Sequence, residues 1–310
     1  MYNTRMFRFA FLLGLAAIAN AATASAVAAN VVAERVDIDT AAQLYQAAAI
    51  REQVRASLGS MPAHIRKLFQ GNTSTPLSDT QLAAVNVAAV RAFRIDVFEA
   101  PALSAFAANL DADTVKKAEA FLATDAGKRW VAADVGLASL SDEDAQKIMD
   151  GDMTAASTPQ RTALYEKLER AERSSESTVQ ILLTMGTAVA LGTAVGSGMD
   201  PGPVEERVRK SSEASRQTLE DSMREPSRRY VAYGYRDLSD TDLRHVLSFL
   251  QSTAGKQYVS AYLASLGAGF HAMGRRCGEQ LGESMRELAM AQLATESVDR
   301  EPQPTAKPHP

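Results

Sequence analysis

Histidine and cysteine are the side chains of this chain that could hold a metal or activate a nucleophile, and their spacing supports neither use. His64, His245, His271 and His309 show no metal-ligand spacing with one another or with Cys277, the single cysteine. The chain also has no Gly-x-Ser-x-Gly elbow to present a nucleophilic serine. We therefore predict no metal, no cofactor and no catalytic residue.

The tripeptide Ala-Gly-Lys occurs twice, at residues 126–128 and 254–256, and is similar to the end of a phosphate-binding loop. Such a loop requires a glycine five residues before its last glycine and a Ser or Thr after the lysine. Leu122 and Leu250 occupy the glycine position, and no hydroxyl residue follows either lysine. The tripeptides therefore do not predict nucleotide binding, and we expect the lysine heads to stay in solvent or to reach a carboxylate.

Both tripeptides belong to a longer repeat, which must position them. Residues 238–263, LSDTDLRHVLSFLQSTAGKQYVSAYL, align without gaps with residues 110–135, LDADTVKKAEAFLATDAGKRWVAADV, at an offset of 128 residues. Leu, Phe-Leu, Ala-Gly-Lys and Val recur in register. Apolar residues fall at helical spacing on both sides of the tripeptide, so each copy predicts a helix, a tight corner and a second helix.

Capping residues mark the two ends of each predicted corner. Ser239 and Asp242 form a capping box, Ser252 caps the second helix, and Gly255 lets the two helices approach closely. We assign structural roles, without catalysis, to a set of corner residues in both copies. This set contains Ser239, Asp242, Phe249, Ser252, Gly255, Lys256 and Tyr258 in the later copy, and Asp111, Phe121, Thr124, Gly127, Lys128 and Trp130 in the earlier copy.

The later copy resembles the hallmark segment of the bacterial family catalogued as domain of unknown function 2059 (DUF2059). The resemblance covers residues 238–259 and lies in Leu-Ser-Asp-x-Asp-Leu followed by Ser-Phe-Leu-x-Ser-x-Ala-Gly-Lys. Thr253 departs from the family pattern, which has proline there, and the earlier copy is more divergent. The resemblance implies an exported, all-helical protein and implies no activity.

The N-terminus has the layout of a secretory signal. Arg5 and Arg8 precede an uncharged run over residues 9–22, and Ala-Thr-Ala-Ser-Ala follows. We predict a signal peptide over residues 1–26, cleaved after Ala24 or Ala26. The mature protein is expected in the periplasm, with secretion as the lesser option. An uncleaved membrane anchor is the alternative, although the apolar run is short for a membrane span.

Composition narrows the range of partners. The formal net charge of -4 argues against non-specific binding of nucleic acid. One cysteine excludes an internal disulfide, and Cys277 is expected to be buried as a small core residue.

The repeat divides the predicted all-α fold into two related units in tandem. We place the first unit at residues 37–150, the second at 158–296 and a proline-rich disordered tail at 297–310. The motif Leu-Tyr-Gln at residues 44–46 has its counterpart, Leu-Tyr-Glu, at residues 164–166.

Capping signals also predict where individual helices begin and end. Ser78, Ser141 and Thr158 start helices, and Gly151 ends one. Residues 39–70 predict amphipathic helix with a break near residues 61–62. The helix that starts at Ser78 is expected to continue towards Phe98, and Pro101 is expected to bend or restart it.

Residues 177–199 form an uncharged stretch with three interpretations. Its Gly192-Thr-Ala-Val-Gly196 spacing is typical of closely packed membrane helices, and its most apolar part, residues 179–195, is at the lower limit for a span. A helix that is apolar all round also suits the centre of a large helical domain. We favour the buried core helix over a self-association face, which would give a homodimer, and over membrane insertion.

Three functional hypotheses remain. The favoured one is an exported, non-enzymatic binding or envelope interaction protein that holds a protein partner or an apolar ligand. The second is a membrane-associated protein that uses residues 179–195. The third is a hydrolase-like enzyme with a site between the two units, for which Asp240, His245 and Lys256 are the candidates.

Overall fold

A computed structural model describes residues 36–71 and 77–298, which form α-helices and no β-strand. The predicted all-α fold is therefore confirmed. The helices are α2 Ile38–Ala47, α3 Ile50–Leu58, α4 Met61–Gly71, α5 Asp79–Ala92, α6 Ile95–Ala108, α7 Ala112–Leu122, α8 Asp125–Ala138, α9 Asp142–Asp150, α10 Pro159–Glu172, α11 Ser174–Gly196, α12 Gly202–Gly234, α13 Asp240–Gln251 and α14 Thr253–Val298.

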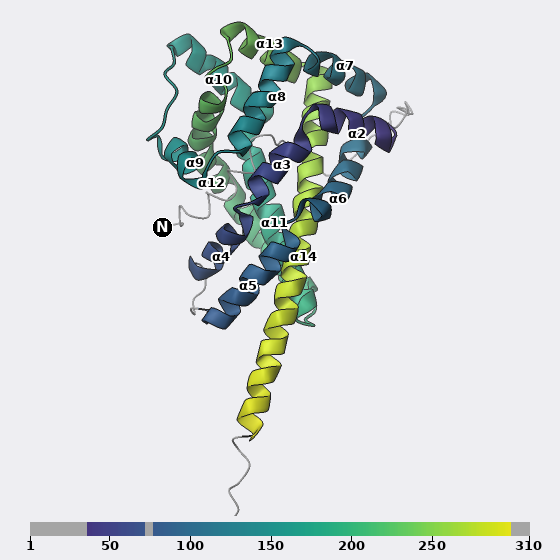
Figure 1. Cartoon of the computed structure of the whole chain (residues 1–310), viewed down its shortest axis with the longest axis vertical. Coiled ribbons are helices and arrows are strands. Elements are labelled where there is room, and N and C mark those ends of the chain that lie inside the picture. Colours follow the sequence, from purple (N-terminus) through teal and green to yellow (C-terminus); the bar gives the residue numbers. More distant parts are fainter. Residues whose placement is uncertain (1–35, 72–76, 299–310) are drawn as a thin grey trace, which may run out of the picture.

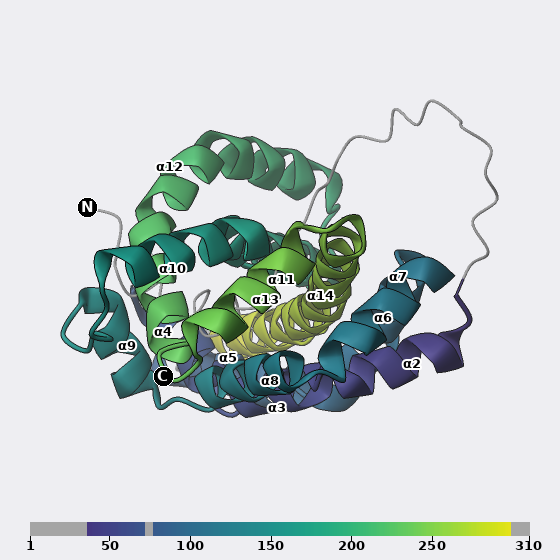
Figure 2. The ribbon, with the colours of Figure 1, turned by 90° about the horizontal axis from the view of Figure 1, so that it is seen from above.

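Helix α14 is the axis of the molecule. It packs against α11, α6, α5 and α7, and its last turns extend beyond the other helices (Figures 1 and 2). Phe98 of α6 meets Phe270 of α14 edge to face, with ring centroids 5.1 Å apart. One hydrophobic cluster includes buried residues from both predicted units, so α14 contributes to a core that the two units share.

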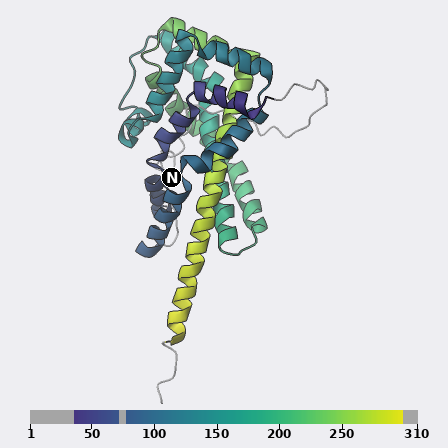
Figure 3. The ribbon, with the colours of Figure 1, turned by 45° about the vertical axis from the view of Figure 1, so that its right-hand side comes forward.

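Helix α11 lies between α12 and α14, and its contact with α14 depends on glycine (Figure 3). A Cβ atom built on Gly278 would overlap the carbonyl oxygen of Val189, and one built on Gly192 would overlap that of Arg275. Because only glycine lets two helix backbones approach this closely, Gly192 and Gly196 are matched within the same chain by the glycines of α14. The close-packing surface of α11 is therefore already occupied.

The burial of α11 agrees with the core-helix interpretation. Val179, Ile181 and Met185 are almost fully buried. Within the described ranges, one helical segment, Pro159–Gly196, is long and apolar enough to cross a membrane by length and composition alone, and 44% of its apolar window is buried. Membrane insertion of this segment stays the lesser alternative to the core helix.

Two predicted helix boundaries were wrong. The stretch from residue 39 has an additional break at Ala49, whose left-handed backbone (φ 50°) separates α2 from α3. The helix after Ser78 ends at Ala92 and does not continue towards Phe98, because Arg94 is extended and pairs with Asp96 in the first turn of α6.

A restart of the helix at Pro101 was also predicted wrongly, because this proline lies inside α6. It removes one backbone hydrogen bond. Ala102, directly after it, and Phe106, about one turn further on, are completely buried. Packing of α6 against α14 therefore outweighs the local preference.

The predicted capping signals are present. Ser78 and Ser239 form complete capping boxes, Ser141 and Thr158 cap their helices, and Gly151 ends α9 with a φ of 90°. Cys277 is buried, as predicted, and burial raises the pKa of its thiol to about 12. The predicted signal peptide lies outside the described residues, as does the predicted tail apart from residues 297–298, which end α14.

Candidate functional site

The two corner segments have the same local geometry. Thr124 donates from Oγ1 to the Phe121 carbonyl at 2.6 Å and accepts from the Gly127 amide at 3.1 Å. Ser252 makes the equivalent bonds to Phe249 and Gly255 at 2.7 and 3.0 Å. In each corner, a Cβ atom on the glycine would overlap the carbonyl oxygen of the phenylalanine. Glycine is therefore a steric requirement at both corners.

Aromatic packing repeats in the same way. The Phe121 ring lies 5.8 Å from Trp130 and the Phe249 ring lies 5.9 Å from Tyr258, both with an interplanar angle of 55°. The two phenylalanines also stack on each other, with centroids 4.2 Å apart and planes inclined by 8°. Equivalent positions of the repeat thus meet face to face.

Polar contacts between the corners are reciprocal. Arg129 of α8 makes a bidentate pair with Asp242 of α13, at 3.1 and 2.6 Å. Thr114 of α7 donates to Gln257 of α14 at 3.1 Å. At the repeat offset, Thr114 corresponds to Asp242 and Arg129 corresponds to Gln257. Each copy's first helix therefore binds the other copy's second helix, as in a two-fold interface.

The three residues considered for hydrolysis are not assembled into a site. Asp240 pairs with Arg161 at 2.7 Å and with Arg244 at 3.8 Å, whereas His245 is exposed on α13 and Lys256 is exposed on α14. Within the described part of the chain, no hydrogen bond or ion pair joins Asp240, His245 and Lys256. These three side chains therefore do not bring a base, a nucleophile and an orienting group together.

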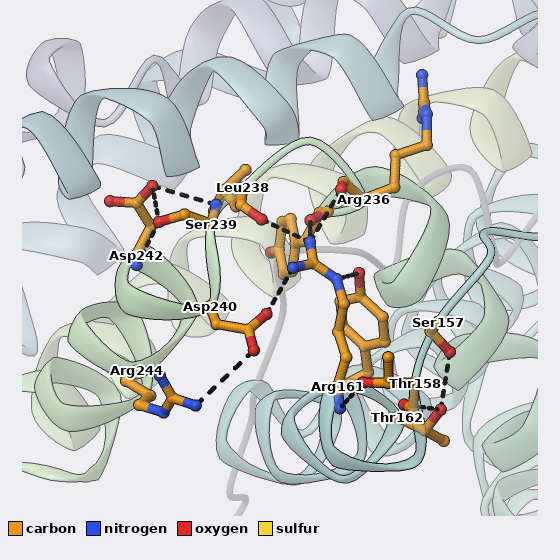
Figure 4. Close-up of polar contacts among 12 residues, drawn as sticks. Ser157, Thr158, Arg161, Thr162, Arg236, Leu238, Ser239, Asp240, Asp242 and Arg244 are labelled. Atoms are coloured by element: carbon orange, nitrogen blue, oxygen red, sulfur yellow. Dashed lines mark hydrogen bonds and ion pairs between the residues drawn. The ribbon is translucent and has the colours of Figure 1, made fainter.

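Arg161 of α10 fixes the connection between α12 and α13 (Figure 4). Its guanidinium donates to the Tyr165 hydroxyl at 2.6 Å and to the Asp240 carboxylate at 2.7 Å. It also donates to three carbonyl oxygens of the connection, at 2.5 to 3.1 Å, which belong to Tyr235, Arg236 and Leu238. The Tyr235 carbonyl also accepts from the Leu238 amide, whereas Arg161 supplies the donor for the carbonyls of Arg236 and Leu238.

A buried acidic cluster surrounds the side chain of Tyr235, at the end of the same connection. The Tyr235 hydroxyl oxygen lies 2.8 Å from Asp134 Oδ1 and 2.7 Å from Glu172 Oε1, and it accepts a hydrogen bond from Trp130 Nε1 at 2.9 Å. Both carboxyl groups are more than nine-tenths buried. Burial raises the pKa of Asp134 to about 8 and raises that of Glu172 well above its ordinary value, with the Asp134 charge adding to the shift of Glu172.

The geometry of this acidic cluster requires at least one bound proton. A tyrosine hydroxyl has one hydrogen and can therefore donate to only one of the two carboxyl groups. The other carboxyl must carry a proton and donate to the Tyr235 oxygen, because two acceptors would otherwise face each other without a hydrogen. Asp134 and Glu172 thus share a proton near neutral pH.

A half-open groove lies between α10, α13 and α14, and four cationic side chains line it. Its volume is about 570 Å³, within the roughly 300 to 1,000 Å³ that is typical of ligand sites. The lining residues are Lys167, Arg170, Ala171, Arg173, Leu250, Gln251, Lys256 and Val259.

Three of these cations lack an anionic partner. Arg173 pairs with Glu176, but Lys167, Arg170 and Lys256 make no hydrogen bond or ion pair through their side chains in the described ranges. No acidic residue lines the groove, although the chain as a whole is acidic. The groove is therefore a local excess of positive charge beside apolar side chains.

Sequence reasoning identified Lys256 only as a corner residue and missed the rest of the groove. Lys167, Arg170 and Arg173 recur every three residues, a spacing that brings basic side chains onto one side of a helix and could have indicated this surface. Asp134 was missed as well, although it follows Trp130 at i+4 and therefore belongs to the buried face of α8.

The described residues contain no group of three His, Cys, Asp or Glu side chains that could hold a metal. No family model, no curated protein and no solved structure matches this chain.

Proposed function

We propose that this chain is an exported binding protein, and that the groove between α10, α13 and α14 holds a ligand with an acidic head and a small apolar part. The observation that carries the proposal is the set of Lys167, Arg170 and Lys256, three cations that face one groove without a carboxylate. Leu250 and Val259, which are largely buried, form an apolar floor beside them. A ligand of this kind would satisfy the charges and cover the apolar surface together.

A matched pair of dyes tests the chemistry of the groove. Anilinonaphthalene sulfonate carries an anionic group on an apolar ring system, and phenylnaphthylamine presents similar rings without the charge. We expect the triple variant Lys167→Gln/Arg170→Gln/Lys256→Gln to weaken binding of the sulfonate dye by at least tenfold, because each lost cation removes a charge interaction. The neutral dye should be affected much less.

Two results would count against this proposal. Equal loss of both dyes would indicate a damaged apolar surface in place of anion recognition. An unchanged affinity for the sulfonate dye would show that the groove does not hold the anion. Circular dichroism of the triple variant provides the control for folding, and it should match the wild type because the three side chains are exposed.

Export and membership of the DUF2059 family are part of the same proposal. The signal-like residues 1–26 and the segment at residues 238–259 support them. Fractionation of the tagged full-length chain tests export. Release of a shortened chain in osmotic-shock fluid is the expected result. A full-length chain in carbonate-resistant membranes would indicate an uncleaved anchor, and a shortened chain there would indicate insertion of the apolar segment at residues 179–195.

A further inference from the structure

The junction between α10 and α11 places two consecutive side chains in different environments. Glu172 ends α10 and directs its carboxyl group into the buried acidic cluster, 2.7 Å from the Tyr235 hydroxyl. Arg173 follows it with a left-handed backbone (φ 52°, ψ 37°), lines the groove and pairs with Glu176. The groove and the acidic cluster are therefore adjacent, and they share one covalent connection.

Other elements that face the cluster also contribute titratable groups. Burial raises the pKa of Tyr258 and Tyr262 of α14, and the nearby Asp134 charge adds to both shifts. The carboxylate of Glu169, one turn before Glu172, accepts hydrogen bonds from the amide and the hydroxyl of Ser175, at 3.2 and 2.7 Å. Asp134 and Glu172 owe their raised pKa mainly to burial, and no cation is among the main groups that shift the pKa of either carboxyl. Loss of the shared proton would thus leave an uncompensated negative charge beside the groove.

We propose that anion binding in the groove is linked to protonation of Asp134 and Glu172, so that the groove holds an anion more tightly when the acidic cluster is protonated. This inference rests on the proposed function and adds its regulation. Two carboxylates around one hydroxyl repel each other, so loss of the proton drives Glu172 away from Asp134. Arg173 is bonded to Glu172, and its guanidinium moves with that displacement.

The negative charge on the deprotonated cluster also weakens anion binding. A negative charge that appears at Glu172 opposes a ligand anion beside Arg173, and binding of the anion must in turn favour the protonated cluster, because the linkage between two sites is reciprocal. At the effective dielectric of about 20 that suits sites near a protein surface, one such charge at about 12 Å from the anion would change its affinity by roughly tenfold.

The affinity for anilinonaphthalene sulfonate between about pH 5 and about pH 9 tests the linkage, because sulfonate, lysine and arginine do not titrate across this range. We expect the wild type to bind the dye roughly tenfold more weakly at the alkaline end. The double variant Asp134→Asn/Glu172→Gln removes both titrating groups, so its affinity should not change with pH. Glu172→Gln alone removes both the repulsion from Asp134 and the negative charge beside Arg173, so this variant should also lose most of the pH response.

His245 provides the matched control, because it is an exposed titratable group on α13, the helix whose last residues line the groove. His245→Gln should retain the wild-type pH response, and loss of the response in this variant would assign it to the histidine and overturn the inference.

A wild type that binds the dye equally at every pH would also overturn the inference, while the proposed function stands. If the dye does not bind at any pH, the proposed function itself fails. If the double variant does not fold, Glu172→Gln decides, and a wild-type pH response in this variant would overturn the inference.

Discussion

Glu172 and Arg173 are consecutive residues whose side chains face opposite sides of one junction, with the carboxyl in the buried acidic cluster and the guanidinium in the open groove. The left-handed backbone of Arg173 produces this separation. A regular helix would turn consecutive side chains by only about 100°, so the break between α10 and α11 is what allows one short segment to serve both sites.

The buried acidic cluster should make the fold more stable in acid than in base. The folded-state pKa of Asp134 is about 8, far above the value of roughly 3.9 for an unfolded aspartate, so the folded chain binds a proton that the unfolded chain releases. This stability is fully present below the unfolded pKa and is lost as pH rises through about 8. Urea midpoints at acidic and mildly alkaline pH test it, and Asp134→Asn should flatten the difference. A wild type that becomes more stable towards pH 8 would contradict this assignment.

The Asp242 carboxylate should contribute stability with the opposite pH dependence. Arg129, followed by Ser239, lowers the pKa of Asp242 to about 2. The stabilisation is therefore present above the unfolded value of roughly 3.9 and is lost as pH falls through about 2. Because Arg129 is half-exposed, we expect Asp242→Asn to cost only about 1 to 2 kcal/mol at neutral pH. Chemical unfolding of Asp242→Asn, Arg129→Gln and the double variant measures the coupling, and strictly additive costs would show that the pair adds nothing.

The close contact between α11 and α14 should make any side chain at Gly278 destabilising. A methyl group there would overlap the Val189 carbonyl, so Gly278→Ala must push the two helices apart and should cost about 3 kcal/mol or more. Gly267 lies on the same helix, and a Cβ atom added to it would meet nothing within 4 Å. Gly267→Ala should therefore be neutral or stabilise by up to about 1 kcal/mol. Equal thermal midpoints for the two variants would contradict the close approach.

Removal of the Arg161 side chain should weaken the connection between α12 and α13. Arg161→Ala leaves the carbonyls of Arg236 and Leu238 without a donor, at roughly 1 kcal/mol or more each, so we expect a loss of about 2 kcal/mol. Arg161→Lys should recover only part, because one ammonium cannot span the guanidinium's acceptors. Arg170→Ala on the same helix should change stability by less than about 0.5 kcal/mol. Urea unfolding compares the three, and similar costs for residues 161 and 170 would refute the assigned role.

Local signals predicted the parts of this fold that depend on neighbouring residues. The helix starts at Ser78, Ser141 and Thr158 and the close approach at Gly255 follow from short-range hydrogen bonding and steric demand. The left-handed break at Ala49 carries no such signal, because alanine rarely adopts that conformation.

The features that local signals did not predict depend on tertiary packing. Pro101 is accommodated within α6 because the helix is held against α14, and the groove forms only where α10 meets α13 and α14. Lys256 stands out in the sequence through its repeat, but its neighbours Lys167 and Arg170 lie more than eighty residues earlier in the chain. No local pattern could bring these three charges together.

The most direct measurement of anion binding in the groove compares Lys256→Gln with Lys128→Gln. The two lysines occupy equivalent positions of the repeat and both are exposed, but only Lys256 lines the groove. Titration with anilinonaphthalene sulfonate should show affinity reduced by roughly threefold to tenfold in Lys256→Gln and changed by less than about twofold in Lys128→Gln. Equal effects of the two substitutions, or none from either, would contradict the assignment of the groove as the binding site.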